Sequence, residues 1–438
     1  MSNPEKSLSV TDRTLVSGAD LANLCCSLVK WIVLVVPLGV AVGSACAGFL
    51  WSLDYVSTLH WQHPWLLYLL PVSGVLVGLL YHRYGRSVES GSNLILDEIH
   101  EPGAGVPSRI VPLVFLGTLA THLCGGSAGR EGTAVQMGGG IASAFGQRLK
   151  SLKPTDLSTL LMAGVAGGFS GVFGTPFAGT IFAMEVLAIG RINYGAILPC
   201  LVAAILADRT CSAWGVVHTP YHITNLENVV GIGIQLNLTF IGKAALAGIL
   251  FGLAARLFLS LAHTAQSFVS RIIPIPYLRP ALGGCCVIGL VFALGTTEYL
   301  GLGVTAPSSD MVSIVSSFRD GGADPLSWFW KIVFTVATIS SGFKGGEVTP
   351  LFFIGATLGN TLSTLLDAPT DLMAGLGFVA VFGAAANTPF ACTVMAIELF
   401  GAGHIVYFAT ACLMAYIVSG DSGIYAARRA EVSKSDVD

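Results

Sequence analysis

The chain has 438 residues, of which 53% are hydrophobic and 11% are charged, and its mean hydropathy is +0.74. A soluble protein of this length needs more charged residues to cover its surface, so the composition indicates an integral membrane protein. The formal net charge of −3 provides no basic surface, which argues against nucleic acid as a partner. The lipid bilayer is therefore the first partner that the sequence predicts.

The N-terminal residues 1–24 are predicted to be a cytoplasmic segment. They begin polar and mixed in charge, and the first apolar run starts near Leu28, too late and too long for a secretory signal. Lys and Arg favour the cytoplasmic side of a membrane. They recur in "HRYGR" (82–86), "QRLKSLK" (147–153) and "ARRAEVSK" (427–434). We therefore expect a multi-pass protein of the inner (plasma) membrane with a short C-terminal tail at 428–438.

The apolar runs differ in length. Four of them can cross about 30 Å of hydrocarbon, namely 28–51, 65–81, 238–262 and 280–296. Others are short or broken by Gly and Pro, namely 108–124, 158–166, 176–189, 349–366, 373–385 and 389–400. Broken helices are tolerated at membrane depth where protein or a water-filled cavity shields their backbone, as in transporters. The pattern predicts an all-α membrane fold, and the 53 glycines predict close helix packing.

The ten cysteines lie mostly in apolar runs and have no CxxC spacing, so we expect small buried side chains. We expect neither a metal site nor a cofactor. No GxSxG or HExxH motif is present, which disfavours an intramembrane enzyme.

An internal repeat divides the chain into two halves. "TPFAGTIFAME" at 175–185 recurs as "TPFACTVMAIE" at 388–398, with seven identities in register. Upstream of each copy, "GREGT" at 129–133 is echoed by "GGEVT" at 345–349. Paired broken helices in corresponding halves indicate a binding site near the midplane of the membrane. Glu185 and Glu398 end the repeated segments, so we expect them to cap helices or form interhelical hydrogen bonds.

The glycine-rich run 125–140 holds the ionisable pair Arg130 and Glu131. Where a glycine break opens a helix, free N–H groups and the positive end of the helix dipole attract an anion. The carboxylate of Glu131 competes for the same donors and leaves them when it is protonated. It is therefore a candidate gate and proton carrier. Arg130 either offsets nearby negative charge or extends to the interface, and a purely structural lock between helices is the alternative for the pair.

"GSAGREGTAVQ" resembles the signature of the CLC family of chloride channels and anion/proton antiporters, as do "GSN" at 91–93, "GGEVTP" at 345–350 and "GIY" at 423–425. The resemblance covers about residues 25–427. It implies a membrane domain of two inverted repeats, about 25–210 and 235–427, with tilted, broken and re-entrant helices, and a homodimer with one pore per subunit.

The same resemblance implies the roles of individual residues. Glu131 becomes the gating and proton-coupling glutamate, and Glu347 a second coupling residue. The hydroxyls of Ser92 and Tyr425 approach the anion, and the backbone around Glu347 and Val348 supplies N–H donors. The remaining residues of the expected anion-binding set are Gly91, Asn93, Gly129, Arg130, Gly132 and Thr349.

Departures from the family pattern indicate the branch. Chloride-transporting relatives carry a phenylalanine-containing tripeptide before Pro350, where this chain has Glu347, Val348 and Thr349. Bacterial chloride/proton exchangers have an inner proton-transfer glutamate at the position of Val186. Both features are similar to the fluoride/proton antiporter branch, whereas Ser92 is a chloride-type residue. The sequence favours proton-coupled export of fluoride, with a chloride/proton antiporter or passive chloride channel as alternatives.

Two questions stay open at this stage. Glu347 either carries a proton or is held neutral for structural reasons. A cation-coupled transporter would use Glu131 and Glu347 as ligands for sodium or protons, but the amide-rich glycine breaks argue against it.

Overall fold

The computed structural model describes residues 18–149, 152–189, 194–223, 237–425 and 429–430. Most of the predicted N-terminal segment 1–24 and of the tail 428–438 lies outside the described residues. The basic segments at 147–153 and 427–434 are described in part. The cytoplasmic placement of these segments and the division into repeats stay predictions.

The described residues of the first half form eight α-helices and three short 3₁₀ helices, some of them far too short to cross a membrane. They are α1 (Gly18–Gln62), η1 (Pro64–Leu69), α2 (Leu70–Tyr84), η2 (Arg86–Val88), α3 (Ser92–His100), α4 (Ile110–Leu123), α5 (Glu131–Arg148), α6 (Pro154–Phe173), α7 (Pro176–Glu185), η3 (Tyr194–Ala196) and α8 (Ile197–Ala213).

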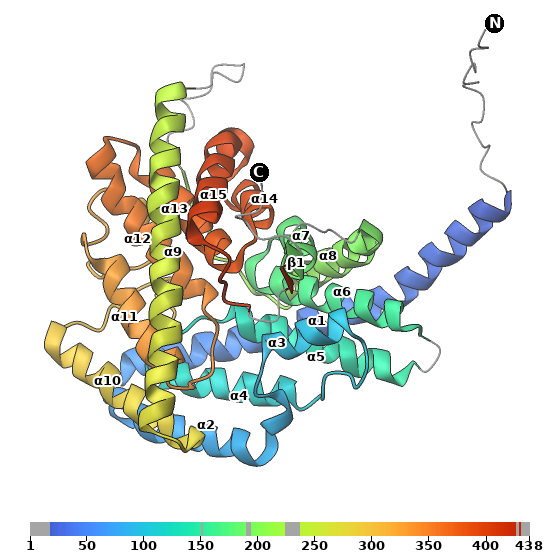
Figure 1. The fold of residues 1–438 in the computed structure, drawn as a ribbon, viewed down its shortest axis with the longest axis horizontal. Helices are drawn as coiled ribbons and strands as arrows, with labels where there is room; N and C mark the ends of the chain where they lie inside the picture. The colour runs from blue at the N-terminus through green and yellow to red at the C-terminus, as the bar shows by residue number, and fades with distance from the viewer. Residues whose placement is uncertain (1–17, 150–151, 190–193, 224–236, 426–428, 431–438) are drawn as a thin grey trace, which may run out of the picture.

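The second half repeats this mixture of long and short helices. Its elements are α9 (Leu238–Ile272), η4 (Pro276–Leu278), α10 (Arg279–Leu294), η5 (Ser316–Phe318), α11 (Ser327–Ile339), α12 (Val348–Leu366), α13 (Thr370–Ala386), α14 (Pro389–Phe400), η6 (Ala402–His404) and α15 (Ile405–Ser419). Figure 1 shows the first-half helices α1 to α6 in the lower and right part of the view, and α9 to α15 in the left and upper part.

The described strands are two residues long each. β1 (Ala188–Ile189) and β2 (Arg429–Ala430) form one parallel pair, which brings the end of the first repeat segment to the C-terminal end of the described chain. The predicted all-α fold is confirmed.

Eight helical segments in the described part of the chain are long and apolar enough to cross a membrane by length and composition. The long predicted runs at 28–51 and 238–262 fall within α1 and α9, which extend well beyond them. α12, which the sequence places among the short or broken segments, has 19 residues and meets the criterion. α8 and the segment η6–α15 also meet the criterion of length and composition for a membrane span. They are missing from the predicted apolar runs because polar residues lie near their ends.

Glycines let the helices around the break approach closely, as predicted. A Cβ atom at Gly138 of α5 would overlap the carbonyl oxygen of Gly164 in α6, and one at Gly355 of α12 would overlap the carbonyl oxygen of Gly377 in α13. Equivalent helix pairs in the two halves therefore cross backbone against backbone.

The reciprocal contact between α7 and α14 joins the two halves. The carboxylate of Glu185, at the end of α7, accepts hydrogen bonds from the N–H groups of Phe390 (3.1 Å) and Ala391 (2.8 Å) at the start of α14. Glu398 of α14 accepts from Phe177 (3.0 Å) and Ala178 (2.8 Å) at the start of α7. The capping role predicted for both glutamates is confirmed, because each satisfies free N–H groups of the other helix.

The expectation of buried cysteines holds only in part. Six cysteines are buried, whereas four are exposed: Cys25, Cys26, Cys285 and Cys286. The exposed ones lie on α1 and α10, apolar helices whose candidate spans are mostly unburied by protein. An apolar run alone does not distinguish a side chain that faces protein from one that faces lipid.

Candidate anion site between the two glycine breaks

The two glycine breaks of the repeat meet backbone to backbone. The N–H of Gly129 donates to the carbonyl oxygen of Gly346 at 2.5 Å, and the N–H of Gly346 donates to Gly129 at 2.7 Å. This antiparallel bridge stands just before Glu131, the first residue of α5, and just before Val348, the first residue of α12. The N-termini of two helices from different halves are thereby brought together.

The carboxylate of Glu131 lies in the cluster of donors at these N-termini. Its Oε2 accepts from the N–H of Arg130 at 3.1 Å and from the N–H of Thr349 at 3.0 Å. The Thr349 hydroxyl lies 2.6 Å from both carboxylate oxygens. Glu131 is 1% exposed, so a buried carboxylate from the first half is held at the start of α12 in the second.

The repeats differ at this site. Thr133 and Thr349 occupy equivalent positions, yet the Thr133 hydroxyl pairs with the Thr118 hydroxyl at 2.7 Å rather than with an acid. Glu347, the counterpart of Glu131, is partly buried, and no group in the described part of the chain donates a hydrogen bond to its carboxylate. Glu131 is therefore held by hydrogen bonds, whereas the carboxylate of Glu347 receives none from the described residues.

The site glycines allow this close approach. A Cβ atom at Gly129 would lie 3.0 Å from the Glu131 carboxylate and 3.0 Å from the Gly346 carbonyl oxygen. One at Gly132 would lie 3.2 Å from the Cα of Gly346. Side chains at these positions would push the two breaks apart.

The "GSN" residues contact a different part of α5. Ser92 is the first residue of α3, and its hydroxyl accepts a hydrogen bond from the amide of Gln136 at 3.3 Å. Gly91 precedes it with a φ of 57°. Asn93 begins α3 beside Ser92, and its N–H donates to the carbonyl oxygen of Ser90 at 3.1 Å. The structure thus links Ser92 to α5 through Gln136, a residue that the sequence analysis does not single out.

Tyr425 lies behind the donor cluster. It is buried, and its ring packs edge-on against Phe182 of α7 with centroids 6.0 Å apart. It is close enough to Glu131 and Glu347 for both carboxylates to act on it electrostatically.

Of the predicted site residues, Gly129, Arg130, Glu131 and Thr349 are joined by hydrogen bonds or direct contact. Val348 is buried beside Thr349, whose N–H donates to Glu131, and the supply of N–H donors to an anion by the backbone around Glu347 and Val348 stays a prediction.

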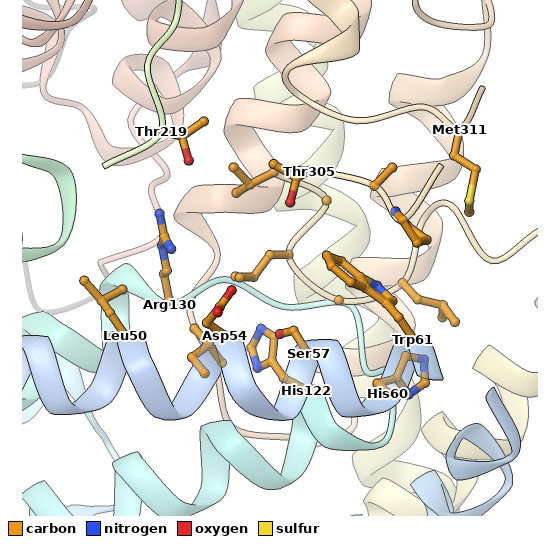
Figure 2. A pocket seen from close by; sticks show the side chains of 18 of the residues that line it. Leu50, Asp54, Ser57, His60, Trp61, His122, Arg130, Thr219, Thr305 and Met311 are labelled. Carbon is orange, nitrogen blue, oxygen red and sulfur yellow. The ribbon is translucent and has the colours of Figure 1, made fainter. Parts of the chain in front are cut away.

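A cavity of about 590 Å³ lies on the other side of Arg130. Figure 2 shows the side chains of Arg130, Asp54, Ser57 and His122 toward this cavity, which we call the outer cavity. The Nε atom of Arg130 is 3.5 Å from the Glu131 carboxylate. Arg130 therefore lines the cavity and lies beside the Glu131 carboxylate, and its role in offsetting negative charge stays a prediction.

Two buried basic residues beside the outer cavity were not predicted. Lys331 of α11 is 0% exposed, and its ammonium donates to the carbonyl oxygens of Tyr299 (3.1 Å) and of Gly301 (2.9 Å), which lines the cavity. His122 of α4 is 2% exposed and lines the cavity floor. The signal was available in the sequence, because an ionisable residue within an apolar run indicates function by default.

Comparison with known proteins places this geometry in a family. The model of the voltage gated chloride channel family, CLC, matches residues 73–420. The "Chloride/fluoride channel protein" of Pseudomonas syringae pv. tomato is 48% identical over 413 residues, which cover 93% of this chain and 88% of the relative.

Solved structures agree. The crystal structure of a CLC-type fluoride/proton antiporter is 34% identical, has a TM-score of 0.85, and is matched over 95% of this chain and 100% of that chain. A slow cyanobacterial Cl−/H+ antiporter shares the fold at 18% identity, with a TM-score of 0.74 and coverage of 89% of this chain and 94% of that chain. The resemblance carried by the GREG motif is confirmed: the chain belongs to the CLC family of anion channels and antiporters.

Proposed function

We propose that this protein is a proton-coupled antiporter that exports fluoride from the cytoplasm. The observation that carries the proposal is the position of the Glu131 carboxylate on the N–H and hydroxyl of Thr349. A site that holds one buried anion through backbone and hydroxyl donors is chemically suited to another of similar size. Glu131 and the transported anion therefore take turns at the same donors.

The exchange follows from the charge of Glu131. As a carboxylate it occupies the donors and closes the path. A proton that arrives through the outer cavity neutralises the carboxylate. The neutral side chain is no longer attracted to the positive helix N-termini, so an anion from the cytoplasmic side replaces it there. Return of Glu131 to its donors displaces the anion outward and passes the proton inward. An inward proton gradient thus drives the anion out.

Fluoride is favoured as the anion for two reasons. It is a small, strongly hydrated ion and a strong hydrogen-bond acceptor, so a site that strips its water must offer short, strong donors such as the Thr349 hydroxyl. The Pseudomonas relative and the solved antiporter of 34% identity are also named for fluoride. Glu347 is proposed as the coupling residue that accepts the proton after Glu131, since its carboxylate carries no hydrogen bond from the described residues.

Chloride/proton exchange and passive chloride conduction are the competing functions. The Pseudomonas relative is named a channel, whereas the solved relative is named an antiporter. The Ser92 hydroxyl at the start of α3 is the observation that favours chloride, because it is a chloride-type residue in this family.

We propose that the protein works in the inner membrane as a homodimer with one anion path per subunit. CLC membership supports this assembly. Single-molecule counting of fluorescently labelled subunits in liposomes should give two copies per particle, and a majority of single copies would contradict it.

The decisive experiment uses purified protein in liposomes loaded with equal fluoride and chloride. Ion-selective electrodes follow both anions while a dye records internal pH. We expect fluoride to leave first and the interior to acidify in proportion. Chloride efflux with acidification would point to a chloride/proton antiporter, and anion efflux without any proton movement would point to a channel.

A further inference from the structure

His122 makes an unusual pair of contacts. Its Nδ1 lies 2.8 Å from the carbonyl oxygen of Thr118, one turn back in α4, and its Nε2 lies 3.0 Å from the carbonyl oxygen of Ala128. Both partners are acceptors only. A neutral imidazole carries a single N–H and can donate to one of them, whereas the imidazolium form donates to both.

The second of these contacts reaches the anion site. Ala128 directly precedes Gly129, whose N–H and carbonyl pair with Gly346, and Glu131 follows two residues later. The glycine break around Ala128 and Gly129 therefore has two hydrogen-bond partners: His122, which lines the outer cavity, and Gly346 of the second half. Any movement of the Ala128 peptide shifts the start of α5, on which the Glu131 carboxylate stands.

We propose that His122 is a positioning residue for the exchange. When both ring nitrogens carry a proton, His122 donates hydrogen bonds to the carbonyl oxygens of Thr118 and Ala128 and holds the glycine break against α4. When only one nitrogen carries a proton, one of these two hydrogen bonds is lost. The proposal rests on the proposed proton-coupled function, because it adds a second proton-dependent group at the outer end of the path. The second proton comes from the outer cavity, which His122 lines.

The surrounding charges act on this proton in opposite senses. Burial of the ring opposes the imidazolium most strongly, the two carbonyl oxygens favour it, and the neighbouring cations of Lys331 and Arg130 oppose it. Glu131 lies beyond Arg130. The other titratable side chains around the cavity are Asp54, His60, His218 and Glu298.

His60 is a natural control. It also lines the outer cavity, and its Nδ1 lies 3.0 Å from the carbonyl oxygen of Leu123 at the end of the same helix α4. Only this one nitrogen has a hydrogen-bond contact within the described part of the chain, so a neutral ring satisfies it. A change of pH should therefore alter the contacts of His122 and leave those of His60 intact.

The test compares wild type, His122→Gln and His60→Gln in fluoride-loaded liposomes. Fluoride efflux is measured from pH 5 to 8 with equal pH inside and outside, so that protonation of the protein changes while the proton gradient stays at zero. In His122→Gln we expect one titration step to disappear and the maximal rate to fall by about tenfold, while the fluoride concentration for half-maximal rate changes little. His60→Gln should keep the wild-type profile.

A wild-type pH profile in His122→Gln would overturn the proposal. If that variant does not assemble, hydrogen–deuterium exchange at the imidazole Cε1, read by mass spectrometry, reports the titration of His122 in the wild-type protein. A titration between pH 5 and 8 supports the proposal, and a ring that stays in one form across this range overturns it. Both results differ from failure of the proposed function, in which wild-type liposomes release no fluoride.

Discussion

Among the described residues, Glu131 is the one acid whose carboxylate lies directly on the helix N-termini of the anion site, where the N–H groups of Thr349 and Arg130 donate to it. Replacing it by Gln keeps the shape and removes the proton. In Glu131→Gln we expect proton movement linked to fluoride to fall by about 100-fold, because an amide can neither carry a proton nor compete as an anion. Simultaneous fluoride and pH recording in liposomes measures this directly.

The matched control for Glu131→Gln is Asp54→Asn, which neutralises an exposed acid of the outer cavity. It should exchange fluoride for protons at the wild-type ratio. If Glu131→Gln and Asp54→Asn both keep the wild-type ratio, the carboxylate of Glu131 is not the coupling group.

Glu347 is expected to matter for coupling more than for binding. Its carboxylate has no donor in the described residues, so Glu347→Gln removes a proton acceptor without removing a hydrogen bond of the donor cluster. We expect the ratio of fluoride to protons to rise, while the half-saturating fluoride concentration shifts by less than about threefold. An unchanged ratio in the liposome assay would assign Glu347 a structural role instead.

At the scale of elements, the reciprocal caps of α7 and α14 should contribute measurably to stability. Glu398→Ala removes the acceptor for the N–H groups of Phe177 and Ala178. We expect the free energy of unfolding in detergent to fall by about 1–3 kcal/mol, because two N–H groups at the start of α7, one of them on the buried residue Ala178, are left without this partner.

Thr180→Val is the control for this prediction. The Thr180 hydroxyl donates only within its own helix, to the carbonyl oxygen of Pro176 at 2.7 Å. Its loss should change stability by less than the loss of Glu398. Equal losses of stability in the two variants, measured by thermal unfolding, would mean that the interhelical cap stabilises the protein no more than a hydrogen bond within one helix does.

The close crossing of α5 and α6 gives a second prediction at this scale. Gly138→Ala places a methyl group against the Gly164 carbonyl, so the helices must separate, at a cost of about 1–3 kcal/mol. Gly48→Ala, on α1 where a Cβ meets nothing within 4 Å, should fold like wild type. Yields of folded protein after size-exclusion chromatography distinguish the two, and equal yields would contradict the packing argument.

The caps of α7 and α14 could be predicted from the sequence, whereas the contacts within the anion site could not. The repeat at 175–185 and 388–398 located the capping glutamates, because the pattern preserves both the Pro-initiated helix start and the acid at its end. The contact of Glu131 with Thr349 could not be read from the chain. It depends on how two breaks 216 positions apart, "GREGT" and "GGEVT", face one another in space. The approach of Ser92 to the anion stays a prediction, and the hydrogen bond that its hydroxyl accepts from Gln136 could not be read from the chain either.

At the scale of the whole molecule, the orientation in the membrane can be tested. The basic segment at 82–86, at the end of α2, is predicted to be cytoplasmic, whereas Val217, 88% exposed, lines the outer cavity together with Pro64 and Leu67, which precede α2. Val217→Cys should react with a membrane-impermeant maleimide in intact cells, and Arg86→Cys only after permeabilisation. Peptide masses identify the labelled cysteine among the native ones, and the reverse labelling pattern would invert the proposed direction of transport.

The paired caps of α7 and α14 also bear on the symmetry of the chain. Each half supplies the carboxylate that caps the other half's helix, so these helix-start N–H groups take their acceptors from the opposite half. Two identical half-length polypeptides related by a twofold axis would make both contacts with one glutamate position. The bonding pattern of these caps is thus the one that two copies of a single symmetric half would make, whereas Glu131 and Glu347, at equivalent positions, have unequal surroundings.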